Sequence, residues 1–162
     1  MRILGIDPGT GILGFGVIES GPKPKLVDAG VIRTKVHQPE PERLLAIYEG
    51  LQEIIKTTKP QVVSVEKLFF SRNVTTAMAV SQARGVVLLV AQQHGLPVAE
   101  YTPPQIKLAL TGYGKADKKQ IQEMVRLLLN LKDAPKPDDC ADALAAALTH
   151  STQASYGLVT KL

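Results

Sequence analysis

At 162 residues and 44% apolar side chains, the chain is long enough for one domain with a sizeable core and too apolar to be disordered. Its net charge of +4 favours an anionic partner such as nucleic acid. Cys140 is the only cysteine, which excludes an intrachain disulfide and predicts a cytoplasmic protein. The longest strongly apolar run, Val86 to Ala91, is shorter than a membrane span, so we expect no membrane association.

The first half of the chain predicts a meander of strands, then a helix and another strand. The first apolar run ends at Asp7, where Pro8 and Gly9 form a turn. Gly14 and Gly16 share one face of the second strand, which indicates close approach of backbone or ligand. The expected elements are strands at 2–7, 12–19 and 26–34, a helix at 42–58 and a strand at 62–66.

The second half predicts mainly helices. A proline-containing capping box begins at Thr102, and a second box joins Asp117 to Gln120. Asp138 or Asp139 opens the last helix. The expected elements are helices at 75–93, 103–112, 118–129 and from 138 or 139 to about 150, with a short strand at 97–101. This order predicts a single α/β domain over residues 1–162, with a five-stranded mixed sheet and helices on both faces.

Four carboxylates stand out by their positions. Asp7 and Glu66 each terminate an apolar strand, and Asp139 and Asp142 share one face at the start of the last helix. If that helix packs across the ends of two neighbouring strands, all four meet in one pocket. Clustered carboxylates repel one another, and a divalent cation such as Mg²⁺ or Mn²⁺ removes that cost. Two such ions can hold a scissile phosphate for in-line attack.

Each acidic residue also has an ordinary structural interpretation. Asp7 before Pro8 and Gly9 fits turn chemistry, while Asp138 and Asp139 fit helix capping and the helix dipole. If Asp138 is the cap, Asp139 and Asp142 point sideways. Spacing alone does not decide between capping and metal binding.

Motifs in the same order over nearly the whole chain resemble those of the RuvC family of bacterial Holliday-junction resolvases. They are Gly5-Ile6-Asp7-Pro8-Gly9, Val65-Glu66 followed by Phe69, Gln82-Ala83-Arg84-Gly85, and Asp139-Cys140-Ala141-Asp142-Ala143-Leu144-Ala145. The resemblance implies a ribonuclease H-like fold and paired symmetric cutting of four-way DNA junctions in recombination and repair. It also implies two Mg²⁺ ions per subunit, with Mn²⁺ as a substitute, and a branch-migration helicase complex as partner.

The family's four acidic ligands carry over onto Asp7, Glu66, Asp139 and Asp142. Asp138 adds a carboxylate that departs from the pattern, which leaves open whether it or Asp139 binds metal. The resemblance also implies a homodimer. The helix from Thr75 is the interface candidate, because its second half is apolar on almost all sides.

Aromatic and basic residues near these motifs are candidates for DNA contacts. An aromatic beside a phosphate-cutting site can stack on a base or wedge between base steps, or it can simply fill the core. The resemblance favours a wedge at Phe69. Lys118 and Lys119 lie in the first turn of a helix, where the dipole disfavours cations unless a phosphate binds there. The full candidate set is Phe69, Phe70, Arg72, Asn73, Arg84, Lys107, Lys115, Lys118 and Lys119.

Three other functions fit parts of the pattern. The turn from Asp7 to Gly11 resembles the phosphate hairpin of actin-like proteins and sugar kinases, but that class needs two such lobes. In a non-catalytic DNA-binding module, the carboxylates would only cap helices and face solvent. Another ribonuclease H-like nuclease, acting on RNA or a hybrid, is the alternative that shares most of the predicted features.

Overall fold

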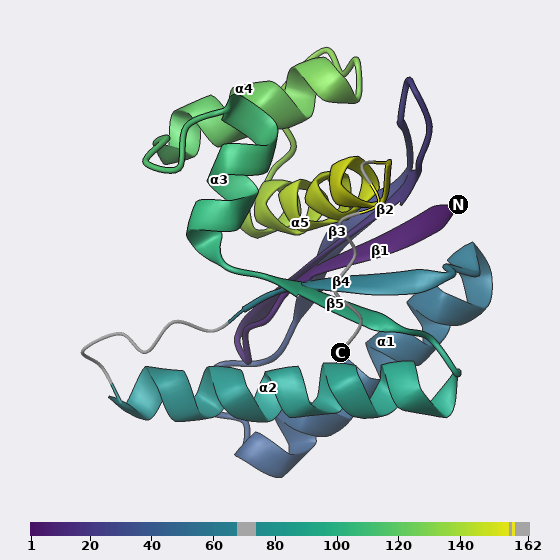
Figure 1. Cartoon of the computed structure of the whole chain (residues 1–162). Coiled ribbons are helices and arrows are strands. Elements are labelled where there is room, and N and C mark those ends of the chain that lie inside the picture. The colour runs from purple at the N-terminus through teal and green to yellow at the C-terminus, as the bar shows by residue number, and fades with distance from the viewer. Residues whose placement is uncertain (68–73, 156, 158–162) are drawn as a thin grey trace.

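The computed structural model describes residues 1–67, 74–155 and 157, arranged as one sheet between two layers of helices (Figure 1). Helices α3, α4 and α5 cover one face of the sheet, and α1 and α2 cover the other. The elements in chain order are β1 (Arg2–Asp7), β2 (Ile12–Glu19), β3 (Lys25–Arg33), α1 (Glu40–Thr58), β4 (Val62–Glu66), α2 (Val74–Gln93), β5 (Val98–Tyr101), α3 (Pro103–Thr111), α4 (Lys118–Leu128) and α5 (Asp138–Ser155).

The sheet has the strand order β3-β2-β1-β4-β5. The first three strands form the predicted antiparallel meander, whereas β4 pairs in parallel with both β1 and β5. The mixed five-stranded sheet expected from the sequence is therefore confirmed. Since β1 and β4 are neighbours and parallel, the carboxyl ends of both strands reach the same edge.

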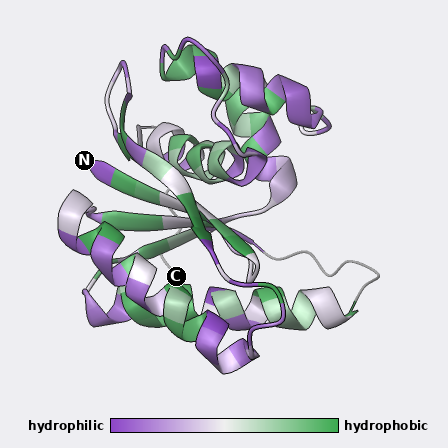
Figure 2. Ribbon diagram, turned by 180° about the vertical axis from the view of Figure 1, so that it is seen from behind, coloured by the Kyte–Doolittle hydropathy of each residue, from purple (hydrophilic) through white to green (hydrophobic). Residues whose placement is uncertain are grey.

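Alternating side chains on the strands supply two separate cores. Ile3 on β1 packs with residues of α3, α4 and α5, while Leu4 and Ile6 pack with residues of α1 and α2. Figure 2 shows the hydrophobic residues concentrated on the strands and on helix faces turned toward them. Because side chains alternate along a strand, Gly5 and Asp7 lie with Ile3 on the α5 face.

Helix α5 lies directly against β1 and β2 because glycines face it. A Cβ at Gly14 would overlap the main-chain oxygen of Asp139, and one at Gly5 would overlap that of Ala143. A Cβ at Gly16 would meet the side chain of Leu144. The close approach predicted at Gly14 and Gly16 is thus confirmed, and the partner is the backbone and side chains of α5.

Some helix ends differ from the sequence prediction. Helix α1 begins at Glu40, two residues earlier than expected, because a proline is tolerated in the first turn. Helix α5 continues past His150 to Ser155, with the hydroxyls of Thr152 and Ser155 bonded to carbonyls one turn earlier. Both predicted capping boxes, at Thr102 and Asp117, are present.

Candidate active site

The strands bring Asp7 and Glu66 side by side. The register pairs Ile6 with Val65, so the next residues, Asp7 and Glu66, end the two neighbouring strands side by side. Ser64 donates a hydrogen bond of 2.7 Å to the carbonyl of Ala146 on α5, so Ser64 lies on the face of β4 that α5 covers. Because residues two apart share a face, Glu66 lies on that same side, as Asp7 does on β1.

The start of α5 brings the second pair of carboxylates to this edge. Asp7 pairs with Gly14 across β1 and β2, and Gly14 in turn touches the backbone of Asp139. Asp142 lies one turn further along α5 and lines a pocket together with Glu66. The missing side chain at Gly14 therefore determines how closely the acidic end of α5 approaches the end of β1.

Burial and mutual repulsion perturb the carboxyl groups. Burial, together with the charges of Glu66, Asp142 and Asp139, raises the pKa of Asp7 to about 8. The pKa of Glu66 is raised by burial and by Asp142. That of Asp142 is also raised, by burial first and then by Asp138 and Asp139, against the opposing effect of Lys118. The four predicted carboxylates thus act on one another electrostatically, as expected for a shared site.

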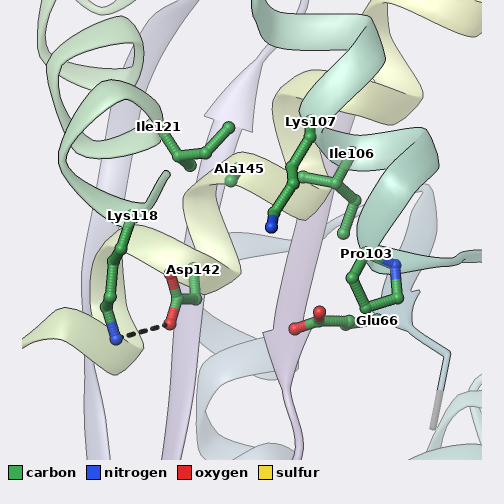
Figure 3. Close-up of a pocket in the computed structure, with 8 residues that line it drawn as sticks. All are labelled: Glu66, Pro103, Ile106, Lys107, Lys118, Ile121, Asp142 and Ala145. Carbon is green, nitrogen blue, oxygen red and sulfur yellow. Dashed lines mark ion pairs between the residues drawn. The ribbon is translucent and has the colours of Figure 1, made fainter. Parts of the chain in front are cut away.

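Lysines from two helices line the acidic pocket, and Figure 3 shows Lys107 pointing toward the space between Asp142 and Glu66 while Lys118 reaches Asp142. Lys118 Nζ lies 3.4 Å from Asp142 Oδ2 and 3.2 Å from Asp138 Oδ2. Partial burial acts to lower the pKa of Lys118, but Asp142 and Asp138 outweigh it and raise that pKa. The pocket holds about 190 Å³, walled by Pro103, Ile106, Ile121 and Ala145.

The four carboxylates suit a hard divalent cation as ligands. Their oxygens gather at the carboxyl ends of β1 and β4, and the nearby lysines supply too little positive charge to balance them. In the described parts of the chain, no three acidic, histidine or cysteine side chains are arranged to coordinate an ion as they stand. Lys118 is the cation paired with Asp142 in this arrangement. The residues therefore fit a metal by their chemistry and by their convergence on one end of the sheet.

Comparison with known proteins identifies the family. The family described as "Crossover junction endodeoxyribonuclease RuvC" matches residues 3–150. The chain belongs to the RuvC family. Proteins of that name from Brevibacillus brevis and Desulfitobacterium hafniense are 57% and 59% identical to it over 152 residues, covering 93% of this chain and 92% of each relative.

Solved structures agree with this assignment. Thermus thermophilus RuvC in complex with Holliday junction substrate superposes with a TM-score of 0.95 at 41% identity, covering 100% of this chain and 99% of that one. The yeast mitochondrial Holliday junction resolvase superposes with a TM-score of 0.69 at 14% identity, covering 94% and 78%. At that identity the yeast protein supports the ribonuclease H-like fold alone.

The other residues predicted to contact DNA lie in different places. Lys107 lines the acidic pocket. Lys119 lines a separate pocket with residues of α3 and α4, and Lys115 is exposed in the loop before α4. Arg84 on α2 donates to Glu100 on β5 with an Nε–Oε1 distance of 2.8 Å. Phe69, Phe70, Arg72 and Asn73 lie outside the described residues.

Two polar residues near these RuvC motifs escaped the sequence reasoning. Gln122 donates a 2.9 Å hydrogen bond to Asp138 Oδ1, and its place four residues after Lys118 on one helix face was a usable signal. Glu100 is the buried partner of Arg84, and it is the one carboxylate in an otherwise apolar strand. Its partner on α2 is distant in sequence, so no local pattern identified the pair.

Proposed function

We infer that this protein resolves four-way DNA junctions by endonucleolytic cleavage, as a crossover junction endodeoxyribonuclease in recombination and repair. One observation carries this conclusion. The whole chain superposes on a RuvC solved with its Holliday junction substrate, and the TM-score is 0.95. The acidic edge formed by β1, β4 and α5 supports the same function from the residues upward.

The ligands that we propose for metal are Asp7, Glu66, Asp139 and Asp142, holding two Mg²⁺ ions per subunit that Mn²⁺ can replace. The raised pKa values of Asp7, Glu66 and Asp142 support this, since burial and repulsion between the carboxylates disfavour the charged forms that a bound cation would stabilise. When bound, such ions activate a water and stabilise the leaving 3′-oxygen. Asp138 is 59% exposed and turned to Lys118 and Gln122, which supports Asp139 as the ligand.

The chain's own basic residues would bind and orient the DNA. Lys107 and Lys118 reach the acidic pocket, so we propose that they contact the phosphates next to the scissile bond. For Lys118 this means exchanging its carboxylate partners for a phosphate. The remaining DNA contacts are proposed at the base-contacting wedge Phe69 and at Phe70, Arg72, Asn73, Arg84, Lys115 and Lys119.

A homodimer is proposed because a junction offers two equivalent strands for symmetric cuts. The exposed side chains of Val74, Met78 and Leu89 support α2 as the interface. This helix is long and apolar enough to cross a membrane, with mean hydropathy 1.5 and 22% of that stretch buried, but a helix in a protein interface satisfies the same criteria. A branch-migration helicase partner and a cytoplasmic location are proposed from the family.

A substrate panel tests the function. Wild-type protein and Asp7→Asn are incubated with labelled four-way junction, linear duplex and RNA–DNA hybrid, with and without Mg²⁺. We expect paired symmetric cuts in the junction alone, only with wild-type protein and metal, while Asp7→Asn still binds the junction. Preferential cutting of the hybrid would instead favour another ribonuclease H-like nuclease, and metal-independent binding without any cleavage would favour a binding module.

A further inference from the structure

The turn that follows Asp7 is held by hydrogen bonds from outside β1 and β2. Thr34, which follows β3, donates its backbone N–H to the carbonyl of Gly11 at 3.1 Å. Its hydroxyl donates to the carbonyl of Thr10 at 2.5 Å. One residue therefore holds two consecutive carbonyls of this turn.

Arg43 on α1 extends this arrangement. Its Nε donates to Thr34 Oγ1 at 2.9 Å. A hydroxyl has one hydrogen, which Thr34 gives to Thr10, so it accepts from Arg43 through a lone pair. A hydroxyl that donates and accepts at once is polarised, which strengthens both bonds. The chain of bonds thus runs from α1 through the end of β3 into the Asp7 turn.

The guanidinium of Arg43 is itself fixed at its far end. A Cβ built on Gly11 would lie 3.5 Å from Arg43 Nη2, so the group passes over the turn. Arg43 Nη1 lies 3.8 Å from Glu40 Oε2, and the Arg43 side chain is only 22% exposed. Arg33, the last residue of β3, precedes Thr34 in the chain and is exposed, so it offers a basic side chain for a control substitution.

We propose that Thr34 and Arg43 are positioning residues that hold the Asp7 turn and so keep the Asp7 carboxylate aimed for metal binding. The proposal rests on the role of Asp7 as a metal ligand given above. The main-chain pairing of Asp7 with Gly14 fixes the start of the turn, and Thr34 fixes its last two residues. Release of that end would let the strand terminus and its carboxylate move.

Mn²⁺ titration by calorimetry, without DNA, tests the pair. Thr34→Val keeps the shape and removes the hydroxyl, while Arg43→Lys keeps the charge and removes the Nε donor. We expect both to weaken Mn²⁺ binding about tenfold, the size of effect seen when a residue supporting a metal ligand is lost. Thr34→Ser should restore binding to within about twofold, and Arg33→Met should leave Mn²⁺ binding unchanged.

The double variant Thr34→Val/Arg43→Lys separates positioning from general loss of stability. If the two residues act through one chain of bonds, it should bind Mn²⁺ no more weakly than the worse single variant. Additive losses that track the melting temperature would overturn the proposal. Junction binding without metal should be equal in wild type and in the Thr34 and Arg43 variants, because neither residue is among the proposed DNA contacts.

Mn²⁺ binding by Asp7→Asn distinguishes failure of the metal role of Asp7 from failure of the positioning role of Thr34 and Arg43. If wild-type protein binds Mn²⁺ no better than Asp7→Asn, the metal role of Asp7 is wrong and the positioning pair falls with it. If Asp7 is needed for Mn²⁺ binding but Thr34→Val and Arg43→Lys bind as wild type does, only the positioning pair is wrong.

Discussion

The Asp7 carboxyl carries an electrostatic cost that shapes both stability and chemistry. Its pKa is raised to about 8, so the folded protein resists ionisation that the unfolded chain undergoes near pH 4. The unfolded state loses this proton first, and folding is therefore destabilised as pH rises from about 4 to 8. A bound cation would remove that cost in the folded state alone.

Asp7→Asn should consequently stabilise the metal-free protein while abolishing cleavage. At pH 8 we expect a rise in melting temperature of about 5–10 °C, corresponding to about 2–4 kcal/mol, and almost no rise at pH 4. Differential scanning calorimetry with a chelator measures this. The exposed Asp133→Asn is the control and should show no such pH dependence. A uniform loss of stability in Asp7→Asn would mean that the carboxylate has favourable partners instead.

Substitutions of the neighbouring carboxylates Asp138 and Asp139 should have different effects on the cleavage rate. Asp138 is bonded to Lys118 and Gln122 on α4, whereas Asp139 raises the pKa of Asp7 by its charge. We expect Asp139→Asn to lower the single-turnover rate at least 100-fold. Asp138→Asn should retain the rate within about threefold. The reverse order would identify Asp138 as the ligand.

At the scale of the secondary-structure elements, the position of α5 depends on glycines of β1 and β2. Its acidic first turn reaches β1 because Gly14 has no side chain where Asp139 passes. Any side chain there would displace the helix and separate Asp139 and Asp142 from Asp7. The position of the site is thus determined by a steric contact between β2 and α5, and the carboxylates follow from it.

Gly14→Ala tests this contact. Because the added methyl group would overlap main-chain atoms, we expect a loss of about 2 kcal/mol or more in the free energy of unfolding and near-complete loss of cleavage. Gly21→Ala is the matched control for stability. Gly21 lies in the exposed turn between β2 and β3 with no atom within 4 Å of an added Cβ, so alanine should change the free energy of unfolding by less than about 0.5 kcal/mol. Urea unfolding measures both, and equal effects would exclude the steric explanation.

For the whole molecule, local pattern was sufficient to predict the strands, the helices and the two strand-terminal carboxylates. Asp7 and Glu66 could be singled out because each of them ends an apolar run that reads as a strand. The side of the sheet that α5 covers depends on contacts between distant segments, and these leave little trace in local sequence. The Arg84–Glu100 and Lys118–Asp142 ion pairs also join distant segments, so local sequence did not predict them.

At the scale of the whole molecule, α2 carries an exposed apolar face that suits association between subunits. The exposed residues Val74, Met78 and Leu89 recur along one side of α2, next to small residues such as Ser81 and Gly85. An apolar face of this kind is costly to leave in water, so we expect a dimer through α2. Leu89→Glu should place charges at the interface and produce monomers in light scattering coupled to size exclusion.

A control at equal exposure decides whether this effect is specific. Leu127 on α4 is 54% exposed, as is Leu89, so Leu127→Glu should remain dimeric. On a plasmid with an extruded cruciform, the Leu89→Glu monomer should nick single strands, because paired cuts need two active sites on one junction. Linear product from a protein shown to be monomeric would contradict the requirement for a dimer. If Leu89→Glu stays dimeric and cuts in pairs, the interface lies on another face of the molecule.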